Sequence, residues 1–215
     1  MGQLARDPPV TRDVFWPGRP ARCRRRQQLP DQTRSVHHGI KYRALRAKDP
    51  LVVRTEMSKA FPIPQQAMFD SFADPVAHVR LFAIIKSSTK AIRKGIENLL
   101  GENQFYAFEH VQESNLPPRL MLLKYTLEPP TRITKVGVTD PFLVETVRPM
   151  DKKKAAVTMD FAALSKQETE FKVTSSFATT TGEIFSRGFI DRVWLNFFER
   201  MMVANGMLKK RDMQT

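Results

Sequence analysis

The sequence predicts an α+β fold in which an antiparallel sheet of about six to seven strands is covered by one long C-terminal helix. Three observations predict it. Short segments rich in β-branched and aromatic residues follow one another between residues 104 and 180, separated by turn residues. Two short helical patterns precede them, and one long amphipathic segment, Arg187–Arg211, comes last. Because the connections are too short for crossover helices, the strands are expected to pair antiparallel.

The first fifty residues carry most of the positive charge. The net charge of the chain is +13, of which residues 1–50 supply +8 (12 Lys and Arg against 4 Asp) and residues 51–215 supply +5 (23 against 18). Six prolines interrupt the first range and apolar residues are few. Burial there is too small to offset chain entropy, so we expect a basic, disordered tail over residues 1–50 and a folded domain over residues 51–215.

The predicted domain opens with a strand and two short helices. Leu51–Phe61 alternates and is rich in β-branched residues, which predicts a strand. Pro64 suits the first turn of a helix over Gln65–Ala73, and the Asp-Pro dipeptide that follows ends this helix and begins a second short one. Residues 83–101 fit either a helix or a strand that enters a loop. The strand is favoured, because a glycine interrupts the helical pattern.

Six further segments are typical of strands. Each is six to thirteen residues of alternating or dense apolar character, and each is bounded by proline, aspartate or a charged loop. They are Gln104–Glu113, Arg119–Leu127, Ile133–Val138, Phe142–Val147, Ala155–Leu164 and Glu168–Thr180.

The predicted C-terminal helix has a wide apolar face. A helix this apolar needs a surface to cover, which the preceding strands supply. Three basic residues end it, where cations suit the negative end of the helix dipole. The apolar face is either core packing or, in part, the roof of a pocket, and its methionines slightly favour a pocket that adapts to varied ligands. The face consists of Ile190, Val193, Trp194, Phe197, Met201, Ala204 and Leu208, widened by Phe189, Phe198 and Met202.

Composition excludes several classes of protein. One cysteine excludes an intramolecular disulfide framework, and four scattered histidines do not make a structural zinc site, so no metal or cofactor is expected. No run of about 18 apolar residues occurs, so no transmembrane helix is expected. We expect an intracellular, cytoplasmic protein, or a nuclear one if the Arg22–Arg26 cluster acts as a targeting signal.

Three stretches resemble the START-like helix-grip superfamily (SRPBCC), which includes polyketide cyclase-like and lipid-transfer proteins. They are Phe61–Phe82 (FPIPQQAMFDSFADPVAHVRLF), Lys90–Gly95 (KAIRKG) and Phe108–Tyr125 (FEHVQESNLPPRLMLLKY). The resemblance covers residues 51–211. It implies a curved antiparallel sheet that grips the C-terminal helix, with a cavity between them for a hydrophobic or amphiphilic, lipid- or polyketide-like small molecule.

The resemblance also implies which residues line this cavity. A one-residue shift of strand register moves every side chain to the other face, so the set depends on the face chosen for each strand. The expected ligand-binding residues are Phe108, His110, Met121, Leu123, Tyr125, Met159, Phe177, Trp194, Phe197, Phe198 and Met201.

Two of these residues are weak candidates for catalysis. His110 shares its parity with Phe108, so its imidazole could face the cavity and transfer protons, although a lone histidine on an apolar face is more often a core residue. Tyr125 could donate a hydrogen bond into the cavity. No nucleophile elbow, P-loop, dinucleotide fingerprint or zinc-protease motif occurs.

Three functions remain open. Binding or transport of a hydrophobic small molecule without catalysis is favoured. A cyclase- or dehydratase-like enzyme in the same cavity, using His110 or Tyr125, is the second. Binding of nucleic acid or another partner through the basic residues 1–50 is the third. The oligomeric state is left open.

Overall fold

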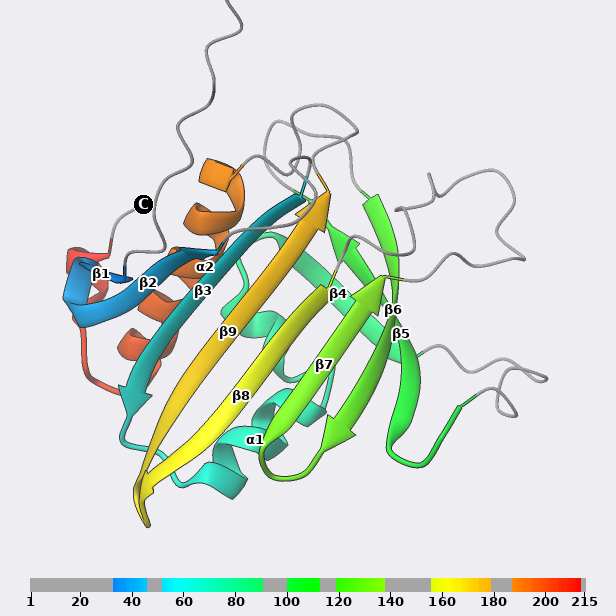
Figure 1. Ribbon diagram of the computed structural model, residues 1–215, viewed down its shortest axis with the longest axis horizontal. Coiled ribbons are helices and arrows are strands. Elements are labelled where there is room, and N and C mark those ends of the chain that lie inside the picture. Colours follow the sequence, from blue (N-terminus) through cyan, green and yellow to red (C-terminus); the bar gives the residue numbers. More distant parts are fainter. Residues whose placement is uncertain are drawn as a thin grey trace, which may run out of the picture.

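The computed structural model describes residues 33–45, 52–90, 100–112, 119–137, 156–178 and 187–213. Within these ranges all strands belong to one antiparallel sheet in the order β1-β2-β3-β9-β8-β7-β6-β5-β4, and the helices lie on one side of it (Figure 1). The strands are β1 (Thr33–Val36), β2 (Ile40–Leu45), β3 (Val52–Phe61), β4 (Ile85–Lys90), β5 (Gln104–Val111), β6 (Arg119–Glu128), β7 (Arg132–Gly137), β8 (Ala156–Ser165) and β9 (Glu168–Ala178).

The α+β class, the antiparallel pairing and the closing helix agree with the sequence-based prediction, but the described sheet has nine strands where six to seven were expected. The two additional strands, β1 and β2, come from the range assigned to the disordered tail. Strand β2 pairs with the edge of β3 and β1 pairs with β2. Backbone pairing requires few apolar side chains, although Ile40 is fully buried. Residues 1–32 and the expected strand at Phe142–Val147 lie outside the described residues.

The segment between β3 and β5 follows the prediction closely. Helix α1 spans Gln65–Ala73, and the second short helix is η2, a single 3-10 turn over His78–Leu81. The ambiguous segment forms strand β4 at its start, as favoured; residues 91–99 lie outside the described ranges.

Helix α2 (Arg187–Ala204) is shorter than predicted. It ends because Gly206 adopts a left-handed φ of 69°, with its N–H donating to the Val203 carbonyl at 3.1 Å and the Met207 N–H donating to the Met202 carbonyl at 2.8 Å. This hydrogen-bond pattern caps a helix C-terminus. The three basic residues expected in its last turn therefore follow the helix and partly form the 3-10 turn η4 (Lys210–Asp212).

Aromatic side chains from α1, the sheet and α2 form the centre of the core. Phe72 of α1 stacks on Phe171 of β9 with ring centroids 4.9 Å apart, and it also contacts Phe197 of α2 at 5.8 Å. Phe198 lies 5.5 Å from Phe171 and 6.2 Å from Phe61. Burial of this apolar surface, at about 25 cal/mol per Å², fixes α1 and the middle of α2 against the sheet.

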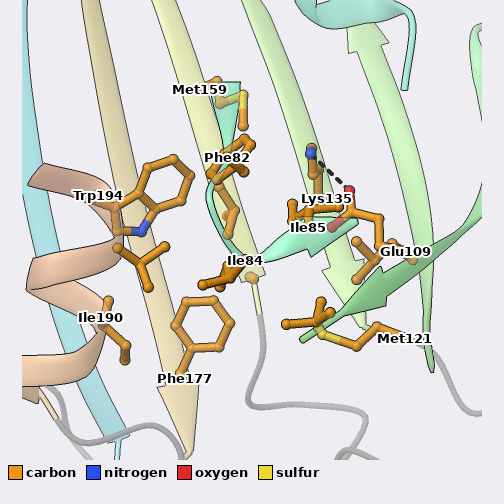
Figure 2. Close-up of a pocket in the computed structure, with 15 residues that line it drawn as sticks. Phe82, Ile84, Ile85, Glu109, Met121, Lys135, Met159, Phe177, Ile190 and Trp194 are labelled. Atoms are coloured by element: carbon orange, nitrogen blue, oxygen red, sulfur yellow. Dashed lines mark hydrogen bonds and ion pairs between the residues drawn. The ribbon is translucent and has the colours of Figure 1, made fainter. Parts of the chain in front are cut away.

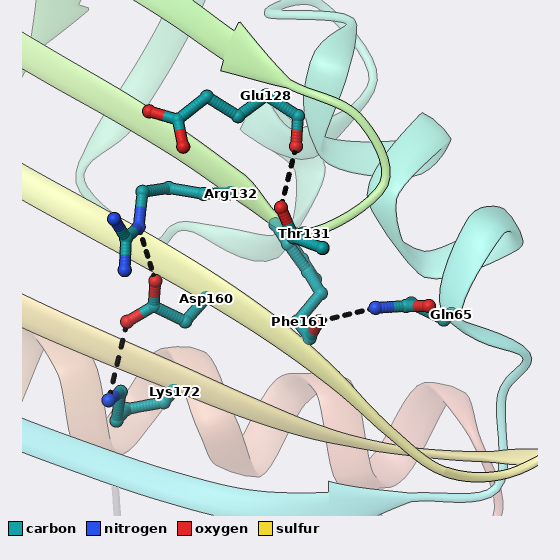
Figure 3. A network of polar contacts seen from close by, with 7 residues as sticks. All are labelled: Gln65, Glu128, Thr131, Arg132, Asp160, Phe161 and Lys172. Carbon is teal, nitrogen blue, oxygen red and sulfur yellow. Dashed lines mark hydrogen bonds and ion pairs between the residues drawn. The ribbon is translucent and has the colours of Figure 1, made fainter.

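The turn between β6 and β7 ties the sheet to the start of α1 (Figure 3). The Thr131 N–H and hydroxyl donate to the Glu128 carbonyl at 2.8 and 3.1 Å. The Phe161 N–H on β8 donates to the Thr131 carbonyl at 2.8 Å, and the Gln65 side-chain amide donates to the Phe161 carbonyl at 2.6 Å. These bonds satisfy backbone groups where the sheet meets the helix.

The outer face of the sheet is polar where β7, β8 and β9 adjoin. Arg132, Asp160 and Lys172 are neighbours across β7, β8 and β9, and Asp160 accepts from Arg132 Nε at 2.6 Å and pairs with Lys172 Nζ at 3.4 Å (Figure 3). This face contrasts with the apolar inner face, so the sheet has a clear inside and outside.

Candidate functional site

The inner face of the sheet and α2 enclose a pocket of about 90 Å³ that is partly open to solvent (Figure 2). Thirteen of its fifteen lining residues are apolar, and the other two are Glu109 and Lys135. The apolar residues are Phe82, Ile84, Ile85, Val111, Met121, Leu123, Ala156, Val157, Met159, Phe177, Ile190, Val193 and Trp194.

Strand register places the two charged residues on the inner face. Glu109 on β5 lies opposite Met121 on β6, and Lys135 on β7 lies opposite Tyr125 on β6. Directly opposed residues of antiparallel strands share a face, and side chains two apart on one strand share it too. The same face of β7 carries the fully buried Ile133, so Lys135 is directed into the interior.

Glu109, Lys135 and Tyr125 form a hydrogen-bonded group at the wall of the pocket. Lys135 Nζ lies 3.1 Å from Glu109 Oε1, and the Tyr125 hydroxyl donates to the same oxygen at 2.6 Å. All three side chains are buried; 4% of Glu109 and 5% of Lys135 are exposed. Figure 2 shows the Lys135 ammonium pointing toward the Glu109 carboxylate beside Phe82 and Ile85.

Burial changes the proton affinity of this group. It lowers the pKa of Lys135, although the charge and hydrogen bond of Glu109 act in the opposite direction. Burial also raises the pKa of Tyr125, and the adjacent Glu109 carboxylate raises it further, so the phenol keeps its proton. The group therefore combines a hydrogen-bonded phenol with an amine whose positive charge is disfavoured.

Five of the eleven expected ligand-binding residues line the pocket: Met121, Leu123, Met159, Phe177 and Trp194. Four others are buried but are not among its lining residues. Of these, Tyr125 contacts the lining residues Glu109 and Lys135, whereas Phe197, Phe198 and Met201 belong to the core.

Phe108 and His110 lie on the outer face of the sheet, which corrects the face assumed for β5. They pair with Leu122 and Leu120 of β6, and 42% of Leu120 is exposed. The neighbouring odd-numbered residues Ala107 and Glu109 are buried instead. The His110 imidazole therefore does not reach the pocket. The error arose because both faces of β5 carry aromatic residues, so alternation alone did not distinguish them.

The charged pair is the feature that sequence reasoning missed. Glu109 and Lys135 lie within two of the predicted strands, Gln104–Glu113 and Ile133–Val138, but neither was a predicted site residue. One signal was present: Ile133 and Lys135 share parity on a short strand, so burial of the first implies an inward lysine.

Comparison with known proteins places this geometry in a known fold. No protein-family model matches the chain, and no curated protein matches it. The lipid transfer and protein localization domain of human StarD13 superposes with a TM-score of 0.59 at 10% sequence identity, covering 83% of this chain and 89% of that chain. A STAR-related lipid transfer protein from Xanthomonas axonopodis gives a TM-score of 0.56 at 13% identity, covering 83% and 98%.

The chain has the START-like helix-grip fold. The ZhuI aromatase/cyclase from a Streptomyces species shares this helix-grip fold, with a TM-score of 0.52 at 10% identity over 71% of this chain and 96% of that chain. The fold inferred from the three resembling stretches is thereby confirmed. In the described part of this helix-grip chain, neither α-helix is long and apolar enough to cross a bilayer.

Proposed function

We propose that this helix-grip chain binds a hydrophobic or amphiphilic, lipid- or polyketide-like small molecule in the pocket between the sheet and α2. The observation that carries the proposal is the apolar lining of the pocket, interrupted at one wall by Glu109 and Lys135. Removing apolar ligand surface from water stabilises a complex by about 25 cal/mol per Å². A few polar groups in such a pocket orient a ligand.

Two kinds of structural neighbour support this proposed binding function. The StarD13 domain and the Xanthomonas protein are named for lipid transfer, and the ZhuI protein is named as an aromatase/cyclase. A lipid has a large apolar surface, which agrees with the apolar lining of this pocket. The pocket volume of about 90 Å³ holds only part of such a molecule, so a bound ligand extends toward the open side.

Filling the pocket tests the proposal. Val157 lines the pocket from β8, and Leu164 lies on the same strand outside it with 54% of its surface exposed. Val157→Phe is expected to weaken binding of a fluorescent fatty-acid analogue by at least tenfold, whereas Leu164→Phe leaves binding unchanged. Fluorescence titration measures both affinities, and circular dichroism checks that both variants fold. Equal affinity for the two variants would place the ligand elsewhere.

A cyclase- or dehydratase-like activity in the same pocket is the second candidate. The observation that favours it is the Tyr125–Glu109–Lys135 group, whose oxygen and nitrogen atoms are 2.6 and 3.1 Å apart and suit proton transfer. His110 takes no part, because it lies on the outer face. Incubation with a linear poly-β-ketone distinguishes the two functions: an enzyme changes its mass or connectivity, and a carrier returns it unchanged.

A further inference from the structure

Lys135 is the one lysine among the described residues that line the pocket. Its stem rises from the middle of β7, and its Nζ lies 4.8 Å from the centroid of the Tyr125 ring and 5.9 Å from that of Phe82. Its Nζ also lies 3.1 Å from Glu109 Oε1, the oxygen that accepts the Tyr125 hydroxyl, and the other described lining residues of the pocket are apolar. An amine in this position meets a bound ligand inside the pocket, away from bulk water.

An apolar environment favours the neutral, nucleophilic form of a lysine. Desolvation penalises the ammonium, and burial lowers the pKa of Lys135. A buried lysine of this kind is the usual source of Schiff-base chemistry, which an arginine cannot perform. Structure alone would require no amine here, since an apolar residue would fill the same wall without the cost of desolvating an ion pair.

We propose that Lys135 captures the carbonyl group of a hydrophobic aldehyde or ketone as a covalent imine within the pocket. This inference rests on the proposed function, because the apolar part of the ligand must first enter the pocket. The ligand class is thereby narrowed to apolar molecules that carry a reactive carbonyl.

Glu109 is placed to move the proton. Lys135 passes one ammonium proton to the Glu109 carboxylate, and the neutral amine attacks the carbonyl carbon, forming a C–N bond. Glu109 returns the proton to the carbonyl oxygen, giving a carbinolamine. A second proton from nitrogen reaches the hydroxyl through Glu109, the C–O bond breaks, and water leaves. The products are a protonated imine, the Glu109 carboxylate and one water molecule.

The total charge stays the same through these reaction steps, which suits a buried site. The ammonium and carboxylate at the start are replaced by an iminium and the same carboxylate at the end, so no uncompensated charge is created in the apolar interior. The Tyr125 hydroxyl holds Glu109 Oε1 at 2.6 Å throughout, and the Tyr125 ring stabilises either cation. Tyr125 is thus a positioning residue.

Reductive trapping tests the inference on the full chain. The protein is incubated with decanal and sodium cyanoborohydride, which converts an imine to a stable secondary amine, and the modified lysines are located by peptide mass spectrometry. Modification at Lys135 is expected to be at least tenfold faster than at Lys41, whose side chain is 65% exposed on β2. Similar rates at the two lysines would overturn the inference.

Two variants separate the chemistry from the binding. Lys135→Arg keeps the positive charge beside Glu109 but forms no stable imine, so the fast modification at residue 135 disappears. In the control variant Lys41→Arg, the fast modification at Lys135 remains. Val157→Phe should slow modification at Lys135 while leaving Lys41 unaffected, because access to the pocket is blocked.

The outcomes also separate this inference from the proposed function. If decanal displaces a fluorescent fatty-acid analogue but Lys135 shows no preferential adduct, the imine is refuted and binding stands. If the analogue itself does not bind and decanal does not modify Lys135 preferentially, the proposed function fails as well.

Discussion

The Glu109–Lys135 pair costs the molecule stability, because two charges are taken out of water to form it. Attraction at 3.1 Å and the additional hydrogen bond from Tyr125 offset part of this cost. Buried pairs of this kind are often replaceable by apolar residues without loss of stability. The position of this pair in the wall of an apolar pocket is the feature on which the proposed carbonyl chemistry rests.

Removing one partner of the pair should destabilise the fold more than removing both. Lys135→Met leaves Glu109 buried without its cation, and a loss of about 3–5 kcal/mol is expected. The double variant Lys135→Met/Glu109→Leu should recover part of this loss, because no buried charge remains. Urea denaturation measures the free energy of unfolding of the single and double variants. If the loss in the double variant equals the sum of the losses in the two single variants, the prediction is contradicted.

Tyr125 should make the protein less stable at high pH. Its pKa is raised by burial and by Glu109, so above about pH 10 the unfolded chain loses this proton while the folded chain keeps it. The folded state then binds more protons, and stability falls by about 1.4 kcal/mol per pH unit.

Tyr125→Phe should remove that dependence. The free energy of unfolding is measured at several pH values between about 9 and about 11. It is expected to fall less steeply with pH for the variant, because the difference in bound protons between the folded and unfolded states is smaller by the Tyr125 proton. The pKa of Lys135 is lowered in the folded protein, so this residue makes stability rise with pH between its folded and its unfolded pKa. It is present in both proteins and does not alter the sign of the difference. Parallel curves would mean that Tyr125 titrates normally.

At the scale of elements, α2 is placed by its two ends as well as by its apolar face. Its start is linked to β2 by the hydrogen bond from the Tyr42 hydroxyl to Asp191 Oδ2, 2.8 Å long. Its end is set by the left-handed Gly206. The helix between them contributes both core residues and pocket residues, so its position decides the shape of the pocket.

Two glycine variants in α2 and its cap should change stability with opposite signs. Gly206→Ala forces a side chain into a φ of 69° and should cost about 1–2 kcal/mol, although a Cβ there meets nothing within 4 Å. Gly188→Ala, in the first turn of the helix and also without close neighbours, should stabilise by up to about 1 kcal/mol. Thermal unfolding measures both. Equal changes in stability for the two variants would show that the left-handed φ of Gly206 does not determine the effect of the substitution.

At the scale of the whole molecule, the sheet extends further toward the N-terminus than composition suggests. Strand β2 pairs with β3 along five residue pairs and buries Ile40 completely. The strands β1 and β2 lie beside α2 at one edge of the sheet (Figure 1). The fold therefore includes residues 33–45, and the boundary of any functional tail must lie before them.

Two deletions test this boundary. Removal of residues 1–32 should leave the melting temperature unchanged within error, whereas removal of residues 1–50 should lower it, because β1, β2 and the bond between Tyr42 and Asp191 are lost. Calorimetry compares the three proteins. Equal melting temperatures for both deletions would mean that β1 and β2 add nothing to the fold.

The shorter deletion also tests the basic tail without disturbing the sheet. If residues 1–32 bind nucleic acid through their arginines, their removal should abolish binding to a short DNA duplex and its dependence on salt concentration. Binding that survives the deletion, with the same salt dependence, would exclude this tail as the contact surface.

Local pattern in the sequence determined the type and approximate bounds of most described elements. Helix α1 was predicted residue for residue, and the inward faces of β6 and β8 were correctly assigned through Leu123 and Met159. These features follow from periodicities of 3.6 and 2 residues, which depend only on near neighbours. The same periodicity predicted an apolar face on α2 that must cover a sheet.

Only the tertiary structure decided what depends on contacts between distant segments. The face of β5 and the addition of β1 and β2 to the sheet are set by strand pairing. Strand register also brings together Glu109 and Lys135, which are 26 residues apart in the sequence. Burial strengthens the interaction between these two charged residues, because the surrounding protein excludes water from them. Sequence established a sheet that grips a helix, and folding placed the amine in its pocket.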